Sequence, residues 1–190
     1  MFSALKEQHP VQSFKEMKFV LLTTLLSAAT VDARGVLAET SPTGLCDSVQ
    51  QYAGYYKLSG LLPKNYFYWF FESRGDPAND PVVLWMTGGP GCSSEVALFG
   101  ENGPCQVNKE GSNTTLNPYA WNSNANLLYI DQPAGTGFSY PITGSDRDEA
   151  GVSADMYDFL QQFFKEHTKV PYMYIPSTAY LFIACLCMNK

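Results

Sequence analysis

The fold is decided by residues 82–94, which read Val82-Val83-Leu84-Trp85-Met86-Thr87-Gly88-Gly89-Pro90-Gly91-Cys92-Ser93-Ser94. The apolar run at its start is bounded by a proline and a glycine, which is typical of a central strand buried on both faces of its sheet. The glycines then permit a tight turn, and Ser93 or Ser94 can cap a helix that runs to about Phe99. The stretch predicts a strand, a glycine-rich loop and a helix, in that order.

Further strands and helices lie on both sides of this stretch. Residues 52–59 and 66–73 are rich in Tyr, Phe and Trp and are separated by a turn, which predicts an antiparallel pair. Residues 126–130 form the next apolar strand, and residues 149–167 repeat apolar side chains at the spacing of an amphipathic helix. Strands that alternate with helices in this way predict an α/β fold.

The composition fits a folded globular protein. The chain has 190 residues, of which 45% are hydrophobic and 14% aromatic, and its formal net charge is −6. No basic stripe is present that could neutralise a phosphate backbone, so nucleic acid is not expected as a partner. The sequence predicts no cofactor and no metal site.

Residues 17–33 have the three parts of a secretory signal peptide. Lys18 supplies the positive charge, an apolar stretch follows, and Val31-Asp32-Ala33 is a suitable cleavage sequence. A buried helix is the alternative, and the run is too short to span a bilayer comfortably. We therefore expect Met17 to be the true start, residues 1–16 to be an extension, and the product to be extracellular, vacuolar or lysosomal.

Two other features indicate the secretory route. All five cysteines follow the predicted signal peptide, where an oxidising compartment favours disulfides, although an odd number hints at a missing partner. Asn113-Thr114-Thr115 is an acceptor sequence for N-glycosylation, which makes Asn113 a candidate modification site. The cysteines are Cys46, Cys92, Cys105, Cys185 and Cys187.

The glycine-rich loop carries the chemistry. A strand that runs into such a loop and then a helix presents backbone N–H groups that can hold an anion or a developing oxyanion, and Gly89 is our candidate donor. A phosphate-binding loop would need Lys and then Ser or Thr after the glycines, and a dinucleotide loop would need a third glycine where Ser94 stands. A purely structural turn is the remaining alternative.

Several blocks of this sequence resemble, in order, the N-terminal blocks of the serine carboxypeptidase family. The blocks are Tyr52-Ala53-Gly54-Tyr55, Tyr68-Trp69-Phe70-Phe71-Glu72-Ser73, residues 81–94, Glu101-Asn102-Gly103-Pro104, Asn117-Pro118-Tyr119-Ala120-Trp121-Asn122 and residues 126–140. The resemblance implies an incomplete α/β-hydrolase fold with a mixed, mostly parallel sheet. It makes residues 34–170 the N-terminal part of a serine carboxypeptidase domain and residues 171–190 a divergent apolar tail.

The resemblance also implies a function. Members of this family remove C-terminal residues from peptides and proteins in acid, with a Ser, Asp and His triad. By this resemblance Gly89 donates an oxyanion N–H, and Thr87, Gly88 and Glu101 hold the terminal carboxylate of the substrate. Many relatives have Asn where this chain has Thr87, which is a shorter donor.

Glu101 can receive a carboxylate only if the two groups share a proton, because two bare anions in contact repel. An acidic pH preference follows from that requirement. The alternative is that Glu101 is a residue of a surface turn beside Asn102 and Gly103.

The triad itself is absent from the sequence. No Gly-x-Ser-x-Gly elbow is present. Gly137-Phe138-Ser139-Tyr140-Pro141 comes closest, but Pro141 replaces the second glycine, so we interpret Ser139 as a decoy. His9 precedes the predicted signal peptide, and His167 lies at the end of a predicted helix. We therefore expect the chain to be truncated before the nucleophile and to be inactive alone.

The resemblance bears on one cysteine as well. In relatives the cysteine at position 92 pairs with one much later in the chain, which this sequence lacks. Cys185 and Cys187 could substitute, but their spacing does not argue for it. We therefore expect an unpaired thiol at Cys92.

Two other functions are compatible with the sequence. A secreted, non-catalytic protein could use the carboxylate pocket to bind peptide C-termini. A tail-anchored membrane protein could use residues 172–188, which are apolar, uncharged and broken by Pro176, although their length is at the low margin for a membrane span.

Overall fold

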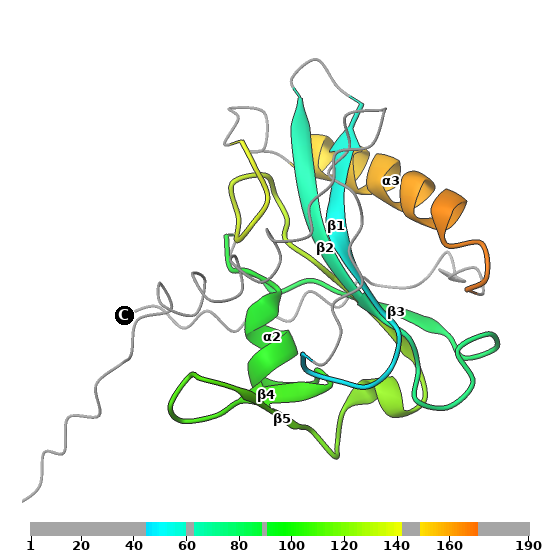
Figure 1. The fold of residues 1–190 in the computed structure, drawn as a ribbon. Coiled ribbons are helices and arrows are strands. Elements are labelled where there is room, and N and C mark those ends of the chain that lie inside the picture. The colour runs from blue at the N-terminus through cyan, green and yellow to red at the C-terminus, as the bar shows by residue number, and fades with distance from the viewer. Residues whose placement is uncertain (1–44, 60–62, 89–90, 142–148, 171–190) are drawn as a thin grey trace, which may run out of the picture.

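The computed structural model describes residues 45–59, 63–88, 91–141 and 149–170. The predicted N-terminal extension, signal peptide and apolar tail lie outside these residues, and so does Gly89. Within them, a sheet separates the long helix α3 from the short helix α2 and a small hairpin (Figure 1). None of the described helices is long and apolar enough to cross a membrane.

The main sheet contains four strands in the order β1-β2-β6-β3. β1 (Gln51–Leu58) and β2 (Lys64–Phe71) form the predicted antiparallel hairpin. β6 (Asn126–Ile130) pairs antiparallel with β2 and parallel with β3 (Val82–Trp85). The predicted mixed sheet is confirmed, but its described strands are not mostly parallel, since two pairings of this main sheet are antiparallel and one is parallel.

β3 lies at the edge of the described sheet, although its apolar run predicted a central strand. Its last three residues are only half-buried, whereas every residue of β6 is buried. An apolar run indicates that both faces of a strand are covered, but it does not indicate which strands pair with its edges. The central strands of the described sheet are β2 and β6.

Each face of the sheet has its own hydrophobic cluster, because side chains alternate along a strand. The odd-numbered side chains of β2 from Phe67 to Phe71 pack with α2 (Glu95–Gly100). The even-numbered side chains from Tyr66 to Phe70 pack instead with α3. Both faces of β2 are therefore buried, which accounts for its nearly continuous aromatic sequence.

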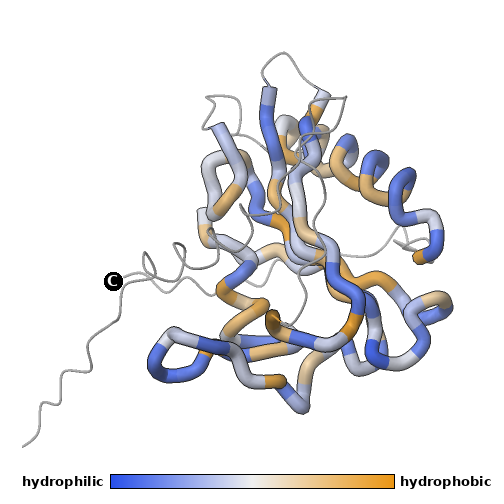
Figure 2. Tube along the Cα trace, in the orientation of Figure 1, coloured by the Kyte–Doolittle hydropathy of each residue, from blue (hydrophilic) through white to orange (hydrophobic). Residues whose placement is uncertain are grey.

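α3 (Glu149–Glu166) is the amphipathic helix that the sequence predicted. Phe159 and Phe163 are fully buried against the sheet, and hydrophobic segments alternate with hydrophilic ones along the helix in Figure 2. An ion pair with a 2.5 Å distance between Lys64 Nζ and Asp155 Oδ2 ties the helix to β2. The helix is thus fixed to the sheet by both apolar and polar contacts.

A second, two-stranded sheet was not predicted. β4 (Cys105–Val107) pairs antiparallel with β5 (Thr114–Leu116) and lies against α2. Strands of three residues are too short to show an alternating pattern in the sequence. A disulfide between Cys46 and Cys105 joins this hairpin to the segment before β1. The expectation of an unpaired Cys92 thiol is wrong, since Cys92 is also disulfide-bonded.

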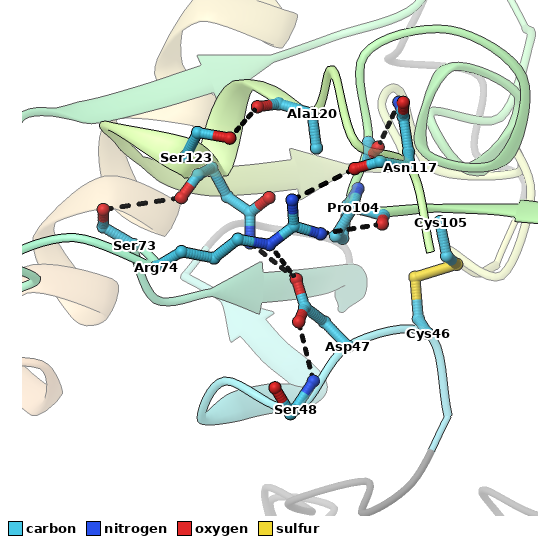
Figure 3. Close-up of polar contacts among 12 residues, drawn as sticks. Cys46, Asp47, Ser48, Ser73, Arg74, Pro104, Cys105, Asn117, Ala120 and Ser123 are labelled. Carbon is cyan, nitrogen blue, oxygen red and sulfur yellow. Dashed lines mark hydrogen bonds and ion pairs between the residues drawn. A yellow bond between two sulfur atoms is a disulfide. The ribbon is translucent and has the colours of Figure 1, made fainter. Parts of the chain in front are cut away.

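A polar network lies beside the disulfide (Figure 3). The Arg74 guanidinium donates from Nε to Asp47 Oδ2 at 2.9 Å, and from its other nitrogens to the carbonyls of Asn117 and Pro104, each at 3.0 Å. Asn122 Nδ2 donates to the same Asp47 oxygen at 2.9 Å. The network joins the ends of β2, β4 and β5 to the segment before β1.

Candidate active site

The glycine-rich loop begins where two parallel strands end at one edge of the sheet. Trp85 and Tyr129 are in register, so the residues that follow β3 and β6 lie side by side. Thr87 is 4% exposed, and its N–H donates to Ser94 Oγ at 3.1 Å. The Ser94 hydroxyl donates in turn to the Ile130 carbonyl at 2.5 Å. Ser94 thus ties the ends of both strands to the start of α2.

This role of Ser94 differs from the predicted one. Ser94 occupies the N-cap position of α2, but its side chain makes no capping hydrogen bond. Its hydroxyl is already used by Thr87 and Ile130. Ser93 Oγ instead accepts the N–H of Glu95 at 3.3 Å, which is a local contact at the helix start.

Asp131 joins the two loops at this edge of the sheet. It follows β6 and is fully buried, and its two carboxyl oxygens accept the N–H groups of Ser94 and Phe138, each at 2.8 Å. Gly137 permits this arrangement, because its φ is +52° and a Cβ there would overlap Asp131 Oδ2. Asp131 was not among the predicted site residues, and its signal in the sequence is an acidic residue directly after an apolar strand.

Glu95 faces Asp131 from the first turn of α2. Its side chain is buried, its Oε2 accepts a hydrogen bond from Ser93 Oγ, and its Oε1 has no donor. The two carboxyl groups are close enough for each to act on the pKa of the other. Burial, and after it the negative charge of Asp131, hold the pKa of Glu95 well above its usual range. Burial also raises the pKa of Asp131, while its hydrogen bonds act in the opposite direction.

The predicted carboxylate-binding residues lie just after β3, in the case of Thr87 and Gly88, and just after α2, in the case of Glu101. Trp85 and Tyr129 pack on one face of the sheet, and Thr87 follows two residues after Trp85, so alternation places it on that face. Gly88 is buried next to it. Glu101 is exposed and directly follows α2, and after burial its negative charge is the further cause that raises the pKa of Tyr129. Within the described residues, no hydrogen bond joins Thr87 to Glu101.

Two polar groups in this region are buried without a partner. Among the residues that the structure describes, the Thr87 hydroxyl has no hydrogen-bond partner, and neither does the Asn102 side-chain N–H group. Asn102 is held by its other end, because its Oδ1 accepts the Tyr129 hydroxyl at 3.0 Å. Buried polar groups are usually paired, so two unpaired ones next to an expected binding loop indicate a place for a polar ligand.

Ser139 and His167 are both engaged in structural contacts. The Ser139 hydroxyl donates to the Asp131 carbonyl at 2.6 Å and accepts the Phe67 N–H at 2.8 Å. The His167 ring lies against α3 and β1, with its centroid 4.4 Å from that of Phe163. The Ser139 hydroxyl is held by the backbone of β2 and of Asp131, whereas the His167 ring packs against α3 and β1, so the two side chains are engaged at different places. The interpretation of Ser139 as a decoy agrees with this geometry.

The fold and the loop define the class of this protein. A mixed sheet with helices on both faces, and a glycine-rich loop after one parallel strand, form part of an α/β-hydrolase fold. Residues 42–180 match the family described as serine carboxypeptidase, and the chain belongs to that family.

Individual relatives agree with this assignment. Serine carboxypeptidase-like 48 of Arabidopsis thaliana is 54% identical over 144 residues, which are 73% of this chain and 26% of the relative. Carboxypeptidase Y homolog A of Talaromyces marneffei is 47% identical over 138 residues, which are 72% of this chain and 24% of the relative. The chain therefore spans about a quarter of the length of these curated relatives.

A solved structure is similar as well. The crystal structure of KEX1(delta)P, a prohormone-processing carboxypeptidase from Saccharomyces cerevisiae, matches with a TM-score of 0.54 and 33% sequence identity. The match covers 63% of this chain and 28% of that one. The likeness extends to a part of the solved chain only.

Proposed function

We propose that this chain supplies the oxyanion loop and the terminal-carboxylate site of a serine carboxypeptidase, which releases C-terminal residues from peptides and proteins. The observation that carries the proposal is the buried Thr87 hydroxyl, which has no hydrogen-bond partner and directly precedes Gly88 and Gly89. Leaving such a group unpaired costs about 1–3 kcal/mol. A peptide carboxylate at this position would supply the missing acceptor.

Glu101 is the second group of the proposed carboxylate site. It is exposed and lies close enough to Tyr129 for its charge to act on the phenol. A carboxylate that binds beside Glu101 repels it unless one proton is shared, so binding should strengthen in acid. Gly89 would donate its N–H to the oxyanion of the reaction, and this role rests on its place in the loop sequence.

The 190 residues by themselves should bind peptide C-termini and not cleave them. Cleavage would need a nucleophile with an adjacent base, and both Ser139 and His167 are held in structural contacts instead. This geometry also supports the non-catalytic reading, in which the chain acts as a binding protein for peptide C-termini.

A secretory route supports the same function. The Cys46–Cys105 disulfide is of the kind that persists in oxidising compartments. Asn113 and Thr115 are exposed beside the β4–β5 turn, while Thr114 faces inward and accepts the Cys46 N–H at 3.2 Å. Strand alternation therefore presents the acceptor Asn113 and Thr115 on one exposed side, as N-glycosylation requires. The compartment would be extracellular or vacuolar or lysosomal.

The first test is the binding of peptides to the full chain and to Thr87→Val. Val has the shape of Thr without the hydroxyl, and the lost hydroxyl makes no hydrogen bond in the fold. We expect the variant to be at least as stable as the parent and to bind free-acid peptides at least about tenfold more weakly, because a hydrogen bond to a charged group contributes about 1.5–3 kcal/mol. Amidated peptides should bind weakly and equally to both proteins. Equal binding of free-acid peptide by both would contradict the proposal.

The second test uses Glu101→Gln, with Glu110→Gln as a matched control at another exposed glutamate. Gln keeps a donor and cannot ionise, so Glu101→Gln should bind free-acid peptides at neutral pH as well as in acid. The control should keep the acid dependence of the parent. A serine-directed fluorophosphonate should not label any of these proteins, and stoichiometric labelling would refute the claim that the chain alone is inactive.

A further inference from the structure

We infer that Glu95 is a positioning residue, whose carboxyl proton is donated to Asp131 and thereby holds Ser94 and Thr87 in their contacts at the end of β3. These contacts should persist in acid and weaken when both carboxyl groups are ionised. The relevance to peptide binding rests on the proposed function, but the contacts and the test do not.

The surroundings of the Glu95 side chain disfavour its ionised form. Its Oε1 is buried without any donor among the described residues, its Oε2 accepts from the Ser93 hydroxyl, and the backbone N–H of Glu95 also acts on this carboxyl group. An ionised carboxylate accepts about four hydrogen bonds, so a buried one that has no donor at one of its two oxygens is poorly stabilised. A proton on Oε1 removes this difficulty, because the group then becomes a donor to the neighbouring Asp131 carboxylate.

The hydrogen-bond donors around Glu95 and Asp131 determine which of the two carboxyl groups carries the proton. Asp131 accepts two backbone N–H groups, those of Ser94 and Phe138, each at 2.8 Å. Donors of this kind favour the ionised form of a carboxyl group. Both oxygens of Asp131 are thus held by N–H groups, whereas Oε1 of Glu95 has no donor among the described residues, so the proton resides on Glu95 and the negative charge on Asp131.

The other groups near the pair do not neutralise a second negative charge. Tyr55 approaches from β1, and burial, followed by the charges of Tyr140, Asp131 and Glu95, raises the pKa of Tyr55 to about 12. Tyr55 is therefore a neutral neighbour, and Tyr140 is exposed. Across the ranges that the structure describes, neither carboxyl group forms an ion pair with Lys, Arg or His. Ionisation of Glu95 would leave two adjacent buried anions.

Ser94 connects the pair of Glu95 and Asp131 to Thr87. Asp131 holds the N–H of Ser94, and the hydroxyl of Ser94 holds the N–H of Thr87 and the Ile130 carbonyl. Repulsion between Glu95 and Asp131 would separate α2 from the end of β6, since Glu95 belongs to α2 and Asp131 follows β6. Ser94 and then Thr87 would move with it. Protonation of Glu95, which would not contact the ligand, thus determines the position of Thr87, which would contact it.

The direction of the pH effect follows from proton linkage. An unfolded Glu loses its proton near pH 4.3, whereas folded Glu95 keeps it to a higher pH. Between these values the folded chain binds more protons than the unfolded chain, so its stability falls as pH rises. Each unit of difference between the two pKa values lowers the folding equilibrium constant about tenfold.

The experiment measures hydrogen exchange of the Ser94 and Phe138 amides in the full chain, corrected for the intrinsic pH dependence of exchange. In the parent and in the control Glu110→Gln, we expect protection to fall by at least about tenfold between about pH 5 and about pH 8. In Glu95→Gln the amide donates to Asp131 at every pH, so protection should stay within about twofold over the same range. Parallel pH curves for the parent and Glu95→Gln would overturn the inference.

A second measurement needs no folded variant. Infrared spectroscopy of the parent in D2O should show a protonated carboxyl band that persists at about pH 6, where an ordinary Glu is ionised. Absence of that band would overturn the inference even if Glu95→Gln failed to fold. The two proposals also fail separately: loss of peptide binding with an intact exchange result contradicts only the proposed function, and pH-independent exchange with intact peptide binding contradicts only the role of Glu95.

Discussion

Two buried aspartates, Asp47 and Asp131, are stabilised in opposite ways. Asp47 receives the Arg74 guanidinium, the Asn122 amide and the Ser48 N–H, at distances of 2.7–2.9 Å (Figure 3). Asp131 receives two backbone N–H groups and faces another carboxyl group. One region neutralises its buried charge with a cation, and the other brings a second acid to it.

The difference separates a structural region from a functional one. A buried carboxylate with a cation and several donors costs little and holds the same geometry over a wide range of pH. Two adjacent buried carboxyl groups are costly, and such pairs cluster at functional sites. The Asp47 network joins the hairpin β4–β5 to the body of the fold, whereas the Asp131 pair lies beside the glycine-rich loop. Four changes test whether the two regions differ in this way.

Removal of the disulfide beside Asp47 should have the largest effect. The double variant Cys46→Ser and Cys105→Ser opens a loop with a sequence separation of 59. We expect the free energy of unfolding to fall by about 4 kcal/mol, because the unfolded chain regains the entropy of that loop. Denaturant unfolding of the parent and the double variant measures it. A loss below about 1 kcal/mol would show that the polar network alone fixes this region.

Arg74→Ala should follow in size, because it leaves Asp47 buried without its cation. The Arg74 side chain is 21% exposed and water can partly replace it, so we expect a loss of about 3 kcal/mol, at the low end for a broken buried pair. Arg74→Lys keeps the charge and loses the planar fork, and it should cost about half as much. An exposed control, Lys165→Ala, should change the unfolding free energy by less than about 0.5 kcal/mol. If Arg74→Ala lowered the unfolding free energy no more than this control, the ion pair with Arg74 would not be needed to keep Asp47 buried.

Gly137→Ala acts on the other aspartate. The new Cβ would overlap Asp131 Oδ2 at a φ of +52°, so we expect a loss of about 2–3 kcal/mol in unfolding free energy from strain and displacement. Gly111→Ala is the matched control, since Gly111 has a φ of +68° but open space where a Cβ would stand. It should lose only about 1 kcal/mol from backbone strain. Equal losses would mean that contact with Asp131 contributes nothing.

The smallest effect is the coupling between Glu95 and Asp131 in a double-mutant cycle. Glu95→Gln, Asp131→Asn and the double variant are compared by unfolding free energy in acid and at neutral pH. Since repulsion grows only when both groups are ionised, the coupling should change by about 1 kcal/mol from about pH 5 to about pH 8. A coupling energy that is constant with pH would mean that the Glu95–Asp131 pair, like the Asp47 network, is structural and does not respond to pH.

Much of the fold was predictable from local sequence. The hairpin β1–β2, the strand β6 and the helices α2 and α3 follow from aromatic runs, apolar runs and helical spacing. The hairpin β4–β5 was missed, because strands of three residues do not show a period. The position of β3 was wrong for the described sheet, because strand order depends on pairing between distant segments.

The candidate site was predictable only in part. The residue types of the loop, Thr87 and Gly88, indicated backbone and hydroxyl donors next to a strand end. Asp131 and Glu95 were not predicted, because they are separated by more than thirty residues and meet only through the parallel pairing of β3 and β6. The unpaired Thr87 hydroxyl was likewise invisible before its surroundings were known.

The sequence by itself determined which segments form strands and helices, and it determined the donor-rich loop between β3 and α2. These properties depend on neighbours within a few residues, and local spacing records them. Only the tertiary structure decided which buried acids face a cation and which face each other. The energy of a buried charge depends on the groups that the fold brings around it from distant parts of the chain, and no local pattern records that arrangement.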